Sequence, residues 1–141
     1  MNIIDKRKQN LIEELKDKEY RDEYVSSSID VGVAFQIRAL REQRGWNQTK
    51  LAEEANMQQE RISTLENPSH SPTLSTLKKL AKAFDVGLIV RFVPISDLVK
   101  RELNLPNESL EVPSFDKDSY FNRFTVSIDI TALREAQKSL A

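Results

Sequence analysis

The chain has 141 residues, of which 39% are hydrophobic and 30% are charged, and this composition fits one compact domain with attached segments. No stretch approaches the ~18 consecutive apolar residues of a membrane-spanning helix, and the first ten residues lack the features of a secretory signal. We therefore expect a cytoplasmic protein with no membrane partner. With no cysteine and one histidine, the sequence excludes disulfides and cysteine nucleophiles and disfavours a zinc site. We expect no metal and no cofactor.

The net charge of −1 is unevenly distributed along the chain. Residues 33–84 carry eight basic side chains and five acidic ones, whereas residues 1–32 and 85–141 are each net negative. For nucleic-acid binding, the distribution of charge matters more than the net charge. The mildly positive charge of residues 33–84 is compatible with such binding.

The N-terminal part predicts two helices. Residues 3–24 have the charge content of a largely exposed helix, and we expect the serine run at 26–28 to end it. The next helix should run to Arg44, where Gly45 suits a left-handed terminating residue. Its apolar residues follow helical spacing at Val33, Ile37 and Leu40. We accordingly divide the chain into a charged N-terminal helix at 1–29 and a central domain at 30–86.

The central domain continues with short helices. Asn47 is placed to cap the segment QTKLAEEA, and a second short helix should span residues 58–66 after a tight turn at Asn56. A proline-flanked loop at 67–72 separates these helices from a well-patterned helix at 74–84, which Thr73 is placed to cap.

The hydrophobic period changes after Asp85. Residues 86–93 are rich in β-branched and aromatic side chains and predict a strand, followed by a helix from Ser96 to Leu103. Because a lone strand leaves its backbone groups unpaired, it needs a partner: either a second predicted strand at 122–128 or the same strand of another chain. We therefore assign residues 87–103 to dimerisation. Residues 104–141 are interpreted as a linker and C-terminal extension that ends in a short helix from Ala132.

Residues 47–66 have the spacing of a helix-turn-helix. Such a unit needs a small residue where the two helices cross, positive φ in the turn, and apolar residues that fix the second helix to the first. With Gln48 as the first position, six residues agree with that pattern: Gln48, Leu51, Ala52, Asn56, Ile62 and Leu65. Asn tolerates the left-handed conformation in which glycine is usual.

With these residues, 31–88 resemble the Cro and phage-repressor (xenobiotic-response-element) helix-turn-helix family, notably in RALREQRGWNQTKLAEEA and RISTLEN. The resemblance implies a mainly α fold: a five-helix lambda-repressor-like DNA-binding domain, here with a short β-strand extension after it. It also implies binding to double-stranded DNA as a homodimer. The function expected is that of a sequence-specific transcriptional regulator, a repressor in the first instance.

The same resemblance implies roles for individual residues. Gln48 and Asn67 would contact DNA phosphates, and the outward side chains of the second motif helix would face base edges in the major groove. Arg41 and Glu66 would form a structural ion pair. Arg38 would face a phosphate or solvent. The full DNA-binding set is Arg38, Gln48, Thr49, Gln58, Gln59, Arg61, Thr64 and Asn67.

Two other functions stay open at this point. The chain could be a DNA-binding antitoxin that also masks a cognate toxin, or a protein-interaction module that uses the motif as a docking surface. An enzyme is not expected: His70 lies in a polar, proline-flanked loop, and the acidic N-terminal helix lacks any accompanying pocket or orienting group.

Overall fold

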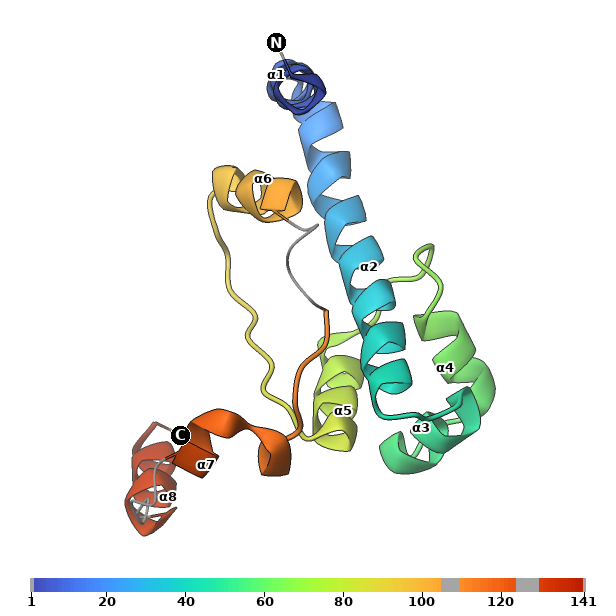
Figure 1. The fold of residues 1–141 in the computed structure, drawn as a ribbon, viewed down its shortest axis with the longest axis vertical. Helices are drawn as coiled ribbons and strands as arrows, with labels where there is room; N and C mark the ends of the chain where they lie inside the picture. Colours follow the sequence, from blue (N-terminus) through green and yellow to red (C-terminus); the bar gives the residue numbers. More distant parts are fainter. Residues whose placement is uncertain (1, 105–109, 124–129, 141) are drawn as a thin grey trace.

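The chain folds mainly into helices. A computed structural model describes residues 2–104, 110–123 and 130–140, and Figure 1 shows their arrangement. The helices are α1 (Ile3–Glu14), α2 (Lys18–Gln43), α3 (Gln48–Ala55), α4 (Gln59–Leu65), α5 (Leu74–Phe84), α6 (Ile95–Asn104), the 3-10 turn η2 (Phe115–Lys117), α7 (Ser119–Arg123) and α8 (Ile130–Ser139). Among these described residues, none of the helices combines the length and apolarity that crossing a bilayer requires.

The first break between helices lies earlier than the sequence predicts. It falls before Lys18, where the Asp17 side chain accepts a hydrogen bond from the Glu19 backbone N–H and caps α2. The serine run at 26–28 does not end a helix, so that prediction is wrong. The Ser28 hydroxyl donates to the Tyr24 carbonyl at 2.7 Å, a bond back along the helix that satisfies the hydroxyl without breaking the backbone ladder.

Caps fix the ends of the central helices. Gly45, at φ 69°, ends α2 in the left-handed conformation predicted for it. Asn47 accepts from the Lys50 N–H, and Thr73 accepts from the Thr76 N–H, so both predicted N-caps are present. Asp85 ends α5 at φ 56°, which the sequence did not indicate.

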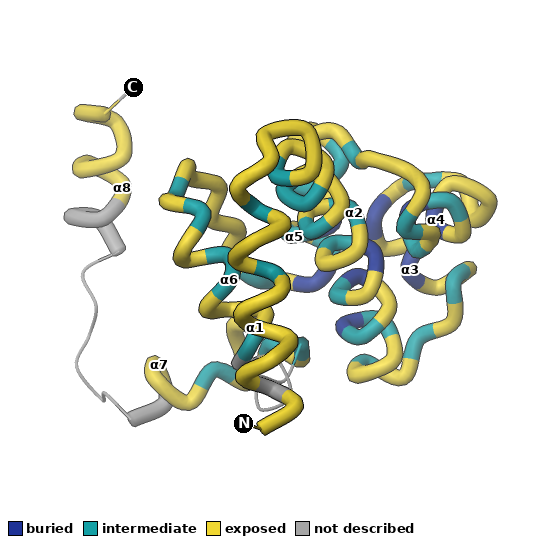
Figure 2. The backbone as a smooth tube through the Cα atoms, turned by 90° about the horizontal axis from the view of Figure 1, so that it is seen from above, coloured by how far each residue is buried: buried dark blue, intermediate teal, exposed yellow. Residues whose placement is uncertain are grey.

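The buried residues of the central domain come from α2, α3, α4 and α5, and Figure 2 shows them gathered where these four helices meet. Residues 30–86, all of which are described, contain the end of α2 and the three helices that follow it. A fifth helix, α6, comes only after the segment 87–93, so the five-helix count implied by the resemblance is not confirmed. The core consists of Ile37, Leu40, Leu51, Ala52, Ala55, Ile62, Leu65, Leu80 and Phe84.

A C-terminal segment closes one side of this core. The Arg44 guanidinium donates to the carbonyls of Phe84 and Val112, both at 2.8 Å, and lies 5.3 Å from the Phe84 ring centre. Burial at this position lowers the pKa of the Arg44 guanidinium. Val112 packs against the core, and its N–H donates to the Gln43 side chain at 3.1 Å. A stretch interpreted from sequence as linker thus contributes contacts to the central domain.

The strand predicted at residues 86–93 is not formed. In the structure these residues are an irregular connection between α5 and α6 (Figure 1). The physical reason is the missing partner, because a strand requires another strand to pair with its backbone. Of the second strand predicted at 122–128, residues 122 and 123 belong to α7, and the remainder lies outside the described residues.

We expect Ile62→Ala to destabilise the domain strongly, because Ile62 is fully buried between α4 and its neighbours. Removing a buried aliphatic side chain of this size costs about 2–5 kcal/mol in the free energy of unfolding. Urea denaturation followed by circular dichroism measures it. The exposed neighbour Ser63 supplies the control, since Ser63→Ala should change stability by less than about 0.5 kcal/mol. Similar losses for both variants would contradict the packing described.

Candidate nucleic-acid interface

The turn between α3 and α4 has the geometry that the spacing predicts. Asn56 adopts φ 52° and ψ 52°, in the left-handed region. The Met57 N–H reaches back to the Ala52 carbonyl at 2.8 Å, which tightens the turn. Ala52 is buried where the helices approach, and a larger side chain there would push them apart. The chain therefore leaves α3 at a fixed angle and enters α4 directly.

Helix α4 has one buried face and one exposed face. Ile62 and Leu65 are buried in the core, as predicted, and hold the helix against α3. Gln58, Gln59 and Arg61 are exposed at its N-terminal end. Gln58 has the backbone conformation of an N-cap but makes no capping side-chain hydrogen bond. The N-terminal half of α4 thus presents polar side chains to solvent.

A chain of hydrogen bonds links the starts of the two motif helices to the end of α4. The Gln59 amide nitrogen donates to the Gln48 amide oxygen at 2.8 Å. The Gln48 amide nitrogen in turn donates to the Glu66 carboxylate at 2.8 Å. These bonds fix which side of the Gln48 amide carries the oxygen and which carries the nitrogen. The sequence identified Gln48 and Gln59 separately, and gave no sign that Glu66 orients them.

Glu66 is held by a second, charged partner on α2. Two nitrogens of the Arg41 guanidinium donate to its two carboxylate oxygens at 2.5 and 3.2 Å, and a third donates to the Trp46 carbonyl at 2.9 Å. The side chains of Arg41 and Glu66 are only 13% and 7% exposed. The hydrogen bond to Glu66 raises the pKa of Arg41 further above its ordinary value. The pair ties the end of α4 to α2.

The other residues assigned to DNA occupy varied settings. Thr49 is exposed on α3, and the Thr64 hydroxyl donates to the Glu60 carbonyl at 3.0 Å within α4. Asn67 follows α4, and its side-chain oxygen accepts from the Ser69 N–H at 3.0 Å and from the Ser69 hydroxyl at 2.8 Å. Arg38 is exposed and pairs with Glu42 at 3.0 Å. The structure thus groups Gln48, Gln58, Gln59 and Arg61 on two adjoining helix starts, while Arg38 stands apart on α2.

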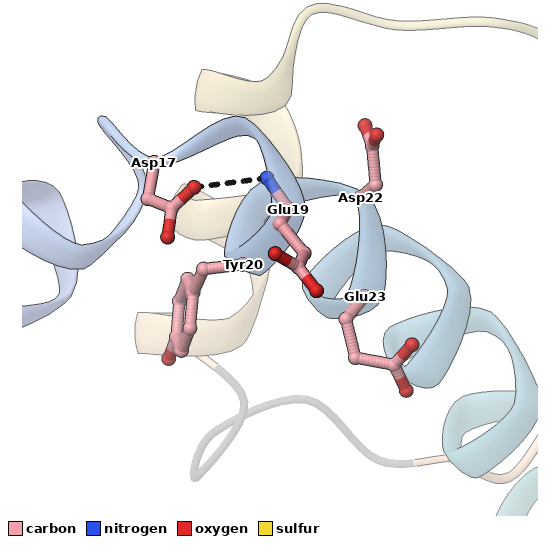
Figure 3. Close-up of a pocket in the computed structure, with 5 residues that line it drawn as sticks. All are labelled: Asp17, Glu19, Tyr20, Asp22 and Glu23. Atoms are coloured by element: carbon pink, nitrogen blue, oxygen red, sulfur yellow. Dashed lines mark hydrogen bonds between the residues drawn. The ribbon is translucent and has the colours of Figure 1, made fainter.

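The start of α2 carries a group of carboxylates. Figure 3 shows a hollow lined by Asp17, Glu19, Tyr20, Asp22 and Glu23, in which the Asp17 carboxylate is engaged by the Glu19 N–H. A hydrogen bond to Glu14, together with nearby carboxylates, raises the pKa of the Tyr20 phenol. Within the described ranges, no cluster of three or more His, Asp or Glu side chains is arranged to hold a metal ion. One of these carboxylates, that of Asp22, is paired with Lys18 at 2.6 Å.

We expect Glu66→Ala to lower the free energy of unfolding by about 3 kcal/mol, because it leaves the largely buried Arg41 charge without its partner. Glu42→Ala is the matched control, since it breaks an exposed pair with Arg38 and should cost less than about 1 kcal/mol. Thermal and urea unfolding of the two variants measure the difference. Equal costs would mean that the Arg41–Glu66 pair is not the tie described.

Comparison with known proteins agrees with this geometry. The model of a helix-turn-helix family matches residues 37–90. The HTH-type transcriptional regulator SutR of Escherichia coli is 24% identical over 103 residues, which cover 71% of this chain and 58% of that regulator. The competence pilus inhibition repressor of Acinetobacter baylyi is 32% identical over 85 residues, which cover 60% of this chain and 74% of that repressor. No solved structure matches. The chain belongs to the xenobiotic-response-element family of helix-turn-helix regulators.

Proposed function

We propose that this protein is a sequence-specific repressor of transcription that binds double-stranded DNA as a dimer through α3 and α4. The observation that carries the proposal is the exposed polar N-terminal half of α4, placed on a rigid crossing with α3. The names of both relatives, a transcriptional regulator and a repressor, support the same function.

The backbone of the DNA would be held at the start of α3. The first N–H groups of a helix point outward with the positive end of its dipole and favour a phosphate. Gln48 lies at this helix start, and its amide nitrogen has a second N–H beyond the one given to Glu66. Asn67 offers a similar amide nitrogen after α4, because its oxygen is engaged by Ser69. These contacts would set the position of the domain on the duplex without selecting sequence.

Base recognition would come from the start of α4. Arg61 is exposed and forms no salt bridge with any residue in the described ranges, so its guanidinium is available for two-point contact with a guanine. Gln59 is oriented by its bond to Gln48, which fixes how its amide can meet an adenine. Gln58 precedes them at the N-cap. The three side chains together would give the domain its sequence preference.

Repression would follow from occupancy of the operator by the bound protein. A small domain that binds its operator tightly excludes other proteins from the same major groove. Two copies would double the number of base contacts, provided that their α4 helices reach half-sites about one helical turn apart.

We expect the protein to select a specific duplex from a random-sequence library, with affinity that falls steeply as salt rises because bound protein displaces counterions. Arg61→Ala and Gln59→Ala should each reduce discrimination between bases by about 1–3 kcal/mol while leaving the far-ultraviolet circular dichroism unchanged. Gln48→Ala should weaken binding to all sequences, and should also reduce discrimination at the base that Gln59 contacts, because it removes the bond that orients Gln59. Fluorescence anisotropy on the selected duplex and on single-base variants measures both effects.

Arg7→Ala and Gln9→Ala on α1 are the matched controls, since both residues are exposed and lie on another helix. They should leave affinity and discrimination unchanged. Binding that ignores salt, or no binding even at low salt, would contradict the proposal and favour a protein-interaction module.

A further inference from the structure

We propose that residues 86–93 are the surface through which two copies of this chain associate. In this arrangement the two segments pair as antiparallel strands about Val90, and the partner's Phe92 enters a cavity lined in part by Val86. The inference rests on the proposed function in one respect, the dimer, and it adds the surface, the register and the residue that inserts. Each is measurable without DNA.

The first observation is that the segment is apolar, exposed and unpaired. Ile89, Val90 and Phe92 are 86%, 63% and 106% exposed. Residues 87–93 make no backbone–backbone hydrogen bond with any other described residue. Figure 1 shows the segment as the long connection that runs from α5 to α6. Residues 87–93 are of types that favour β-strands, and both their side chains and their backbone groups are open to solvent. Such a segment can form a strand when a partner strand is supplied.

The second observation is that the segment is complementary to itself. Alternate residues of a strand share one face, so Val86, Leu88, Val90 and Phe92 would form an entirely apolar face. A two-fold axis at Val90, the midpoint of 87–93, pairs every residue of that range with another of the same range. Leu88 then lies opposite the partner's Phe92. An axis at Arg91 would instead set two like charges against each other, which is unfavourable. Because the same patch serves both sides, the occupant that fits it is a second copy.

The third observation is a cavity at the root of the segment. It has a volume of about 390 Å³ and an apolar lining from Val86, Val112, Pro113, Phe115 and Phe121, together with two aspartates. Gly87 also lines it. With the axis at Val90, the partner's Phe92 lies opposite Leu88 and diagonally across from Val86, which lines the cavity. The fully exposed ring and the unfilled cavity are thus brought together twice in a symmetric dimer.

The natural absence of cysteine makes the register directly testable. Directly opposed residues of antiparallel strands have Cα atoms about 4.5–5.5 Å apart, within the range for a disulfide. We expect Val90→Cys to give a covalent dimer under mild oxidation. Leu88→Cys is the matched control in the same segment: its two copies would be four residues, or roughly 13 Å, apart and should not crosslink. Phe35→Cys, exposed on α2, controls for random collision.

Light scattering on the full chain tests the association itself. At micromolar concentration we expect twice the 16.2-kDa chain mass. Val90→Lys and Val90→Glu should each weaken association at least tenfold, because each places like charges at the axis, and mixing the two variants should restore the dimer. Phe92→Ala should also weaken it, because it removes the inserted ring. Circular dichroism checks that the helices persist in every variant.

A monomeric wild-type protein would overturn the proposal. Pairing of residues 86–93 with another segment of the same chain would overturn it as well. Crosslinking that is strongest at Leu88→Cys or at a neighbouring position other than Val90 would overturn the register. Failure of mixed Val90→Lys and Val90→Glu to form a dimer would also overturn the register. DNA binding is read separately, since a monomer could still bind a half-site in a salt-dependent way. Loss of this interface and loss of the DNA-binding function are therefore distinguishable.

Discussion

A single carboxylate, that of Glu66, connects three helices at the proposed DNA-binding surface and orients two of its side chains, Gln48 and Gln59. It sits at the end of α4, accepts from Arg41 on α2 and from Gln48 at the start of α3, and through Gln48 also influences Gln59. A largely buried anion is costly unless it is paired and fully hydrogen-bonded. Here Arg41 of α2 and Gln48 of α3 donate these hydrogen bonds to Glu66, one residue from each neighbouring helix. The same contacts that satisfy Glu66 therefore fix the polar side chains at the starts of α3 and α4, so stability and the orientation of the surface depend on the same atoms.

The parts of the fold that could be predicted from sequence are those in which local chemistry decides the backbone. Asn56 tolerates a left-handed turn, Gly45 ends a helix, and Asn47 and Thr73 cap one, and each of these preferences acts within a few residues. The buried positions of α3 and α4 follow from helical periodicity for the same reason. The assignment of exposed α4 residues to DNA came from the resemblance. The orientation of Gln48 by Glu66, and of Gln59 through Gln48, depends on contacts between residues 18 and 11 positions apart, which periodicity does not encode.

The features that sequence missed depend on long-range contacts or on competition between local ones. Ser28 looked like a helix breaker, yet its hydroxyl found a carbonyl one turn earlier and the helix continued. The segment around Val112 has the composition of a linker, but its backbone groups are satisfied by Gln43 and Arg44, nearly 70 residues away. Residues 87–93 carry a strand pattern without a strand to pair with. In each case the composition of the segment alone did not reveal which partner its polar groups would find, or that they would find none.

The position of that unpaired segment has a mechanical consequence for the proposed repressor. It begins immediately after α5, whose end is fixed by the left-handed Asp85 and by the bond from the Val86 N–H to the Ala81 carbonyl. Helix α5 in turn packs on α3, so a two-fold axis placed in the segment would be connected to α4 through rigid, capped elements with no flexible linker between them. The spacing of two α4 helices would then be set by the fold and not by the DNA.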